Sequence, residues 1–372
     1  MEAEDKFASA YRVYQKSSSI NKKLLNEKNP AVANDYNNLG GILLKQGKPD
    51  AALKVFNKAM GCCKRSFGEN RFILIRCQNN MGKAYSAKGD FHLARQHFDQ
   101  ALKTGKLYHG YRHLFIANVF NNLGEINIHL DKLDEAMDDH QSALEIDSSL
   151  LGKNHPKVAE DMVNMGMVLM LKAKIEAAEE LFVQAFEISQ NKFGQYHHSI
   201  ALNYNCRGRL ELMKGNKIAA VGFFKKALKV AKSVFQTINH PLLADIATNY
   251  GFAVLEYNKF DESRRFLELA ASIYEKTLGV THPFVVRGYI NLGRICQLLK
   301  ELEAANDNFL KAFSLINKRR GFEHSEITEL RENLMTLAGE FNDRFHRQNP
   351  GTSILYSRPA RQIYQKIKLP GF

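Results

Sequence analysis

Residues 36–59 read YNNLGGILLKQGKPDAALKVFNKA, and variants of this pattern return along most of the chain. One glycine per copy marks the period, with successive spacings of 42, 42, 42, 42, 43 and 42 residues. The seven glycines are Gly40, Gly82, Gly124, Gly166, Gly208, Gly251 and Gly293. A fixed period over seven copies indicates a stack of one repeated structural unit.

Each copy predicts two helices joined by a tight turn. Ala52, Phe56 and Ala59 follow the first glycine at offsets that place them on one face of a second helix. A small-large-small face beside a glycine lets two helices pack closely. The third copy carries His140 where the first carries Phe56. Between the two helices, the segment 46–49 (Gln-Gly-Lys-Pro) has the residues that end one helix and begin another.

The boundary between copies predicts a helix start. Asn29-Pro30 and His155-Pro156 each combine a capping residue with proline in the first turn. Periodic histidines at this boundary favour capping over metal binding, and no metal or cofactor is expected. The histidines so interpreted are His155, His198, His240, His282 and His324. Without a phosphate-binding loop or a paired catalytic motif, the sequence does not predict an enzyme.

The small-large-small pattern is that of the tetratricopeptide repeat, whose common period is about 34 residues. With a 42-residue period, Tyr36-Asn37-Asn38-Leu39-Gly40 and a His-Pro before the first helix, the chain resembles the repeats of kinesin light chains and nephrocystin-like proteins over roughly residues 30–320. The resemblance implies an all-α, right-handed superhelical solenoid of about seven helix-turn-helix repeats with half-repeat caps. It also implies that the first helix of each repeat lines the concave face.

Continuing the period in both directions predicts the domain organisation. We expect an N-terminal capping half repeat at 1–28, seven repeats at 29–321, a C-terminal capping helix at 322–348 and a basic, extended tail at 349–372. Within the tail, residues 361–368 place Ile363 and Ile367 four apart between basic residues. This segment predicts either a short amphipathic helix, a segment that folds back into the groove, or an unstructured tail.

Charge and composition narrow the classes of partner. The net charge is +13, but from Arg344 onwards the chain has six basic residues and no acidic one. The repeats themselves are therefore only mildly basic, which weakens the alternative of an RNA-binding helical repeat. The beginning of the chain does not resemble a signal peptide, and five scattered cysteines favour a reducing compartment. We expect a cytoplasmic protein, associated with the cytoskeleton or a cilium in one hypothesis.

Asparagine occupies the position two before the glycine in six of seven copies. An asparagine amide donates and accepts hydrogen bonds, as a peptide backbone does. This series predicts contact with an extended peptide, and the alternative is that these amides bond neighbouring helices. The asparagine series comprises Asn38, Asn80, Asn122, Asn164, Asn249 and Asn291.

Charged residues that differ from repeat to repeat lie on the same predicted helices as the asparagine series, and they predict which partner the chain binds. Arg76 and Lys83 are seven residues apart, as are Arg287 and Arg294, so each pair shares a helix face. Arg209 is a further basic candidate, and the basic pairs favour an acidic or carboxylate-bearing segment. The sequence therefore predicts a protein-binding scaffold or adaptor. The alternative is a structural subunit of a cytoskeletal or ciliary assembly that packs through broad surfaces.

Overall fold

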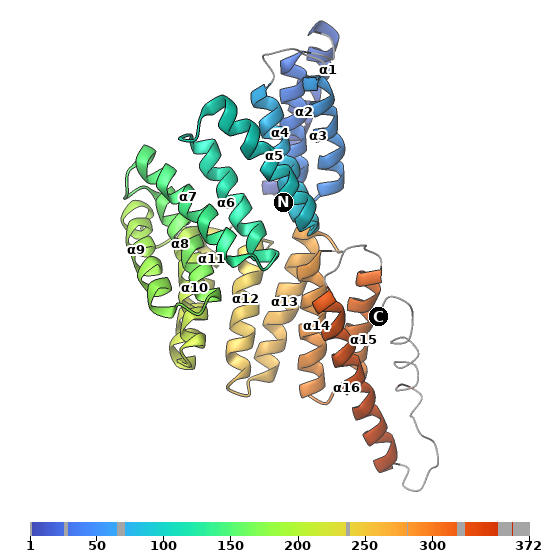
Figure 1. Cartoon of the computed structure of the whole chain (residues 1–372). Helices are drawn as coiled ribbons and strands as arrows, with labels where there is room; N and C mark the ends of the chain where they lie inside the picture. The colour runs from blue at the N-terminus through green and yellow to red at the C-terminus, as the bar shows by residue number, and fades with distance from the viewer. Residues whose placement is uncertain are drawn as a thin grey trace. The chain divides into compact units, whose positions relative to one another are not determined.

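The computed structural model describes residues 2–25, 29–64, 71–235, 239–280, 282–317 and 324–348, together with residue 359. These ranges contain sixteen helices and no strand (Figure 1). The chain divides into two compact units, Met1–Val234 and Phe235–Phe372. The division falls between Gly208 and Gly251, where the sequence has its one 43-residue spacing.

The first unit contains eleven helices within the described residues, and consecutive helices pack against each other. They are α1 (Glu2–Leu25), α2 (Pro30–Lys45), α3 (Pro49–Lys64), α4 (Arg71–Lys88), α5 (Phe91–His109), α6 (Leu114–His129), α7 (Leu133–Leu151), α8 (Pro156–Leu171), α9 (Ile175–Phe193), α10 (His198–Met213) and α11 (Lys217–Val234). Five repeats follow the single helix α1, and the even-numbered helices carry the periodic glycines.

The second unit continues the same pattern with two repeats and one further helix in its described part. Its helices are α12 (Pro241–Leu255), α13 (Phe260–Leu278), α14 (Pro283–Leu298), α15 (Leu302–Asn317) and α16 (His324–Gln348). The pairs α12–α13 and α14–α15 pack as the pairs of the first unit do. The predicted all-α fold of paired helices is therefore confirmed.

The periodic glycine permits the close contact inside each helix pair. A Cβ built on Gly40 would lie 2.4 Å from the ring of Phe56, far inside van der Waals contact. Phe56 is fully buried between α2 and α3, as are its equivalents Phe98, Phe182, Phe224 and Phe309 in other repeats. The glycine and the large residue therefore form one packing unit, as the sequence predicted.

The turn between paired helices requires a left-handed backbone at one position per repeat. Glycine fills it at Gly47, Gly89 and Gly215, with φ of 69°, 73° and 81°. The other repeats place non-glycine residues there, at a conformational cost that glycine avoids. These are Asp131, Ala173, Asn258 and Lys300, with φ of 56°, 56°, 56° and 63°.

Side chains cap the helices that carry the glycines. His155, His240 and His282 accept hydrogen bonds from backbone N–H groups two residues further on, which confirms their predicted capping role. The prediction is wrong in the fifth repeat, because His197 caps α10 and His198 is the first residue of that helix. His197 stands at the position before the first helical turn, which faces the free N–H groups of the helix.

The two ends of the repeat array differ from the repeats. Helix α1 packs on α2 as a single helix, and α16 packs on α15 and α14. Leu334 of α16 is buried, whereas Met335, at the position of the periodic glycine, is half exposed. A residue that faces no second helix has no need to be glycine. Apart from residue 359, the predicted tail, including the segment 361–368, lies outside the described residues, as do the predicted boundaries at 28 and 321.

Candidate peptide-binding surface

The asparagine series makes the same hydrogen bond at three successive repeat junctions of the first unit. Asn80 donates to Asn37 over 3.0 Å, and Asn122 donates to Asn79 over 2.9 Å. Asn164 donates to Asn121 over 3.3 Å. In each case the acceptor is the residue three before the glycine of the preceding repeat. The structural alternative for these amides, bonding between neighbouring helices, is therefore present at Asn80, Asn122 and Asn164.

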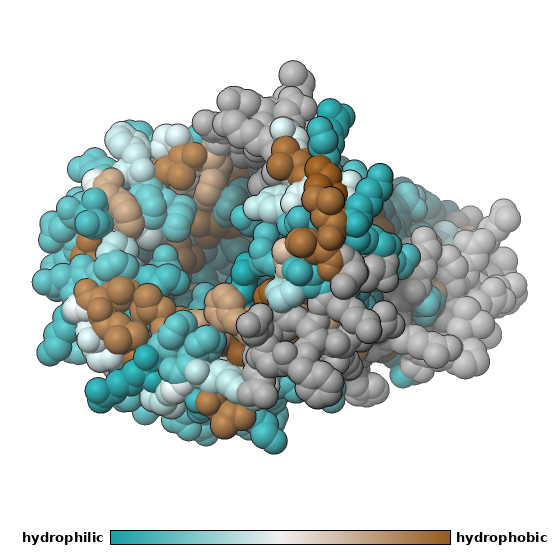
Figure 2. Space-filling view, turned by 90° about the horizontal axis from the view of Figure 1, so that it is seen from above, coloured by the Kyte–Doolittle hydropathy of each residue, from teal (hydrophilic) through white to brown (hydrophobic). Residues whose placement is uncertain are grey.

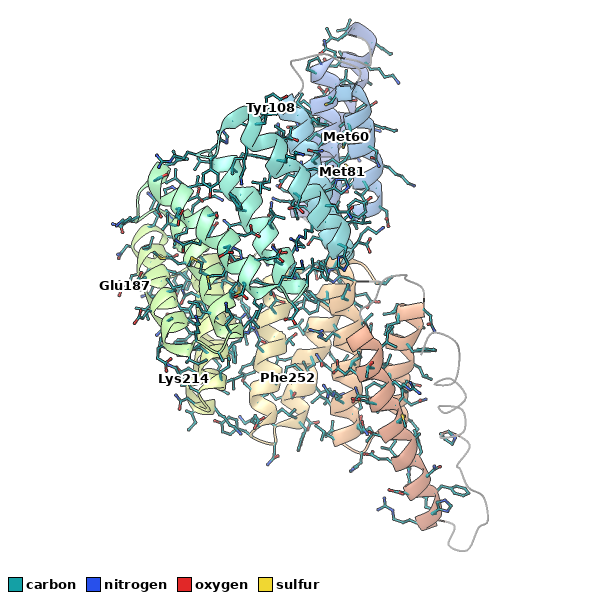
Figure 3. The ribbon with its side chains drawn as sticks, viewed as in Figure 1. Met60, Met81, Tyr108, Glu187, Lys214 and Phe252 are labelled. Atoms are coloured by element: carbon teal, nitrogen blue, oxygen red, sulfur yellow. The ribbon has the colours of Figure 1, made fainter. Side chains whose placement is uncertain are left out.

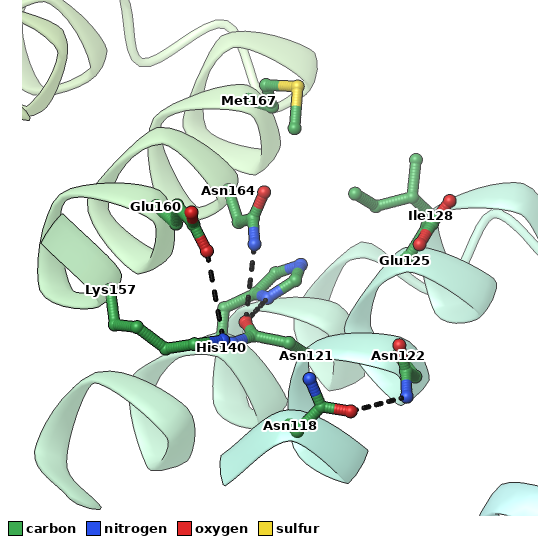
Figure 4. A pocket seen from close by; sticks show the side chains of 10 residues that line it. All are labelled: Asn118, Asn121, Asn122, Glu125, Ile128, His140, Lys157, Glu160, Asn164 and Met167. Atoms are coloured by element: carbon green, nitrogen blue, oxygen red, sulfur yellow. Dashed lines mark hydrogen bonds and ion pairs between the residues drawn. The ribbon is translucent and has the colours of Figure 1, made fainter. Parts of the chain in front are cut away.

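The inter-repeat bond leaves part of each amide available. An asparagine side chain has two N–H groups and an oxygen with two lone pairs, and the inter-repeat bond uses one N–H. Asn122 also donates to Asn118 over 3.3 Å, so its oxygen is the part of that amide that the two bonds leave available. The side chains of Asn80, Asn122 and Asn164 are half-buried rather than enclosed. In Figure 4 the oxygen of Asn164 points away from its bond to Asn121. The bond thus orients the amide without consuming its capacity to bind a peptide.

A cavity of about 350 Å³ lies among α6, α7 and α8. It brings together Asn122 and Asn164 of the series with Glu125, Glu160 and Met167 (Figure 4). The full lining is Asn118, Asn121, Asn122, Glu125, Ile128, His140, Lys157, Glu160, Asn164 and Met167. Sequence reasoning did not predict Ile128, His140 and Lys157 here. The sequence signal for these residues was His140 itself, a polar residue at a position where most other repeats have phenylalanine.

Side chains of both charges line the cavity. Lys157 lies 3.9 Å from Glu160, and both side chains are exposed. Between α4 and α6, burial lowers the pKa of Lys83, and the nearby carboxylate of Glu125 on α6 raises that pKa again in part. Opposite charges therefore face each other along these helices. The arrangement suits a mixed peptide better than a uniformly acidic one.

The predicted basic residues occupy different environments. Arg76 donates to Asn34 over 3.2 Å and to Asn38 over 3.4 Å, both on the preceding repeat. Arg209 is half-buried on α10. Part of the role of Arg76 is therefore to join α2 and α4, which sequence spacing alone did not indicate.

The candidates of the second unit are less accessible. Asn291 is buried on α14, with 7% of its surface exposed, and Asn249 is half-buried on α12. Arg287 is exposed on α14, and Arg294 donates to Glu329 of α16 over 2.9 Å. Within this unit the series thus contributes one partly accessible amide, in contrast to the three bonded amides in the first unit.

A buried polar cluster lies behind the cavity. The Nδ1 of His140 lies 2.9 Å from the oxygen of Asn121, and Asn121 donates to Asp161 over 2.6 Å. Asp161 and Asp147 interact electrostatically, each raising or modifying the pKa of the other, and both residues are buried. Asn121 therefore connects the cavity wall at Asn164 to two buried acids and an imidazole.

Burial shifts the pKa values of this cluster in opposite directions. Burial raises the pKa of Asp161 from 3.8 to about 7, partly offset by the hydrogen bond from Asn121. Burial also raises the pKa of Asp147 and lowers that of His140 from 6.5 to about 4. Burial therefore favours the neutral form of the imidazole and of the carboxyl groups.

Family comparison agrees with this geometry. The tetratricopeptide repeat family matches residues 2–64, 36–106, 115–188, 160–233 and 239–318, and a second tetratricopeptide family description matches 79–150. The chain therefore belongs to the tetratricopeptide repeat family. No curated protein matches the chain.

The chain is similar to several solved structures of low sequence identity. A Rap protein complexed with competence and sporulation factor is 13% identical, with a TM-score of 0.61, covering 98% of this chain and 96% of its own. BtubC (BKLC) from P. vanneervenii is 20% identical, with a TM-score of 0.53 over 65% of this chain and 94% of its own. A putative kinesin light chain from Podosopora anserina is 18% identical, with a TM-score of 0.43 over 55% and 97%.

The described residues lack two kinds of feature. None of their helices combines the length and apolar character needed to cross a membrane. Within the same part of the chain, no group of three or more histidine, cysteine or acidic side chains is placed to hold a metal ion. All five cysteines are buried free thiols.

Proposed function

We propose that this chain is a non-catalytic adaptor that holds an extended segment of a partner protein on its glycine-bearing helices. Asn80, Asn122 and Asn164 bond the peptide backbone of that segment, and the cavity formed by α6, α7 and α8 takes its side chains. The main support is the repeated inter-repeat hydrogen bond, which orients three amides alike at a spacing of one repeat.

The chemistry of the cavity supports a protein ligand. Its amides match the donors and acceptors of a peptide backbone, and Ile128 and Met167 offer apolar contact. The lining carries two carboxylates, Glu125 and Glu160, against one ammonium group, Lys157, which argues against the RNA-binding alternative. The fold is also that of a Rap protein complexed with competence and sporulation factor. A cytoplasmic location and a cytoskeletal or ciliary assembly stay predictions.

The test uses a matched pair of variants at one junction. Asn122→Ala removes an amide that faces the cavity, whereas Asn79→Ala removes the buried acceptor of the same hydrogen bond. Peptides selected from a random displayed library on the intact chain serve as ligands, and fluorescence anisotropy reports their affinity. Asn122→Ala should weaken binding about threefold to tenfold, as expected for one or two lost hydrogen bonds.

The control separates binding from stability. Both variants lose the inter-repeat bond, so both should lower the free energy of unfolding by about 1 kcal/mol. Equal losses of peptide affinity in Asn122→Ala and Asn79→Ala would contradict direct contact by the series. Unchanged affinity in both would also contradict the proposal.

A further inference from the structure

Four large apolar side chains are exposed at one end of α4, α5 and α6. Phe72 is 45% exposed near the beginning of α4, and Leu107 is 75% exposed near the end of α5. Tyr111, between α5 and α6, is 44% exposed, and Leu114, the first residue of α6, is 42% exposed. We call these four residues the apolar edge. Tyr108 lies at the same end of α5 (Figure 3).

Ring contacts surround two members of the apolar edge. The ring of Phe72 lies 5.4 Å from that of His109, which in turn lies 4.7 Å from His113, the sequence neighbour of Leu114. The ammonium group of Lys106, the sequence neighbour of Leu107, lies 5.0 Å from the ring of Tyr111. The four edge residues thus stand at the ends of three consecutive helices, beside rings and a lysine ammonium group. In Figure 2 apolar residues on the face seen from above gather in separate patches among hydrophilic ones.

Packing of the repeat does not require apolar residues at these positions. Phe72 and Leu114 stand at the same position relative to the periodic glycine, and four other repeats have proline at that position. At the position of Leu107, the other repeats have polar residues. The prolines are Pro30, Pro156, Pro241 and Pro283, and the polar residues include Ser149, Asn191, Ser233 and Lys276. Proline suits the first turn of a helix, so phenylalanine and leucine replace a residue that is favourable there. Their exposure calls for a partner outside the repeat.

The sequence around the apolar edge is basic. Residues 100–124 contain Lys103, Lys106 and Arg112 and no acidic residue. Residues 71–89, which form α4 and its end, contain four basic residues and likewise no acidic one. Lys103 and Arg112 are exposed. A ligand that complements this surface carries carboxylates beside its apolar groups.

We propose that the apolar edge is a second docking surface, which binds an acidic segment of a partner protein that also carries large apolar side chains. The chain itself cannot supply such a segment from its C-terminal end, because residues 344–372 contain six basic residues and no acidic one. A symmetric pair of copies would place two basic edges against each other, which is unfavourable. Leu107, the most exposed member, is aliphatic and contributes no base stacking, which favours a protein over RNA.

The test replaces the edge with what other repeats carry. In the double variant Leu107→Ser/Leu114→Pro, each new residue stands at the same position of another repeat, so the fold is preserved. Short random peptides displayed on phage are selected in parallel on the intact wild-type chain and on this variant. Peptides recovered only on the wild type should be rich in aspartate and glutamate together with leucine or aromatic residues. Their affinity, measured by anisotropy, should fall at least about tenfold in the variant.

Three further variants separate charge, apolar contact and the asparagine series. Lys103→Glu/Arg112→Glu should weaken the same peptides about tenfold, and added salt should weaken their binding to the wild type. Tyr196→Asn, at a 60% exposed aromatic between α9 and α10, is the matched control and should leave affinity unchanged. Asn122→Ala should also leave it unchanged, so this surface and the adaptor proposal succeed or fail separately.

Several outcomes would overturn the second surface. The first is that no selected peptide distinguishes the wild type from Leu107→Ser/Leu114→Pro. The second is that the selected peptides lack acidic residues. The third is that Tyr196→Asn loses as much affinity as the edge variant. Tighter binding of the edge to phosphatidylserine vesicles or to single-stranded RNA than to the selected peptides would assign it to a different class of ligand.

Discussion

The second and third repeats share a backbone arrangement but differ in what fills it. In the second, Gly82 packs against the ring of Phe98, and in the third, Gly124 packs against the imidazole of His140. A Cβ on either glycine would approach the opposing ring to within about the same distance, 2.6 Å and 2.5 Å. The repeat geometry therefore accepts a ring of either polarity. With His140, however, the helix pair gains a hydrogen bond to Asn121 and a link to the cavity.

The largest expected effect is the loss of the apolar ring. Phe98→Ala should lower the free energy of unfolding by about 3–5 kcal/mol, because it removes a buried aromatic side chain and leaves a cavity. His140→Ala should cost about 1–3 kcal/mol, since it also removes a buried Nε2 that has no hydrogen-bond partner among the described residues. Urea denaturation followed by circular dichroism measures both. Equal losses would show that the two rings stabilise their repeats equally.

The polar cluster should make stability depend on pH in two opposing ways. Because the folded state raises the pKa of Asp161 from 3.8 to about 7, its contribution to stability falls as pH rises through that window. Because the folded state lowers the pKa of His140 from 6.5 to about 4, its contribution is lost as pH falls through that window. In the wild type the two slopes oppose each other between about pH 4 and 6.5.

Single variants should separate these slopes. Relative to the wild type, Asp161→Asn should become more stable as pH rises from 3.8 to about 7, and His140→Phe should become less stable as pH rises from about 4 to 6.5. The differences should reach a few kcal/mol, at about 1.4 kcal/mol per unit of pKa shift. Urea denaturation across this pH range measures them, with Phe98→His in the second repeat as a control for an added imidazole. Parallel curves for both variants and the wild type would contradict the cluster.

A smaller effect concerns the turn that joins paired helices. The second repeat has Gly89 at the left-handed position and the fourth has Ala173, with φ of 73° and 56°. Ala173→Gly should therefore raise the free energy of unfolding by about 1 kcal/mol, and Gly89→Ala should lower it by a similar amount. Thermal and urea denaturation of the two reciprocal variants measure the exchange. A loss of stability in both would show that Ala173 makes contacts that outweigh its backbone conformation.

The smallest effect is expected at surface ion pairs between repeats. Lys214 lies 2.7 Å from Glu179 and 3.2 Å from Glu211 at the end of α10 (Figure 3). Lys214→Met should lower the free energy of unfolding by less than about 1 kcal/mol, because exposed pairs are screened by water and salt. The difference should disappear in high salt. A larger loss that salt does not change would identify packing of the lysine stem as its cause.

Sequence spacing predicted much of the candidate site but not its bonding. The position of Asn122 and Asn164 relative to the glycine predicted that both lie on the same face of their helices, and the structure has both in the lining of one cavity. Their hydrogen bonds to Asn79 and Asn121 join residues 43 apart, and this pairing depends on how one repeat lies on the next. Asn291 has the same place in the period and is nevertheless buried. A periodic position therefore predicts which face a residue occupies within its helix, but its exposure depends on neighbouring repeats.

By itself, the sequence determined that the chain is a stack of helix pairs, because small and large residues recur at spacings that only a helix brings to one face. It determined the packing of Gly40 on Phe56 for the same reason. Only the tertiary structure decided that His140, Asn121, Asp161 and Asp147 form one buried cluster, since these residues come from three helices. It also decided which apolar residues stay exposed, because burial depends on contacts between elements that local spacing does not specify.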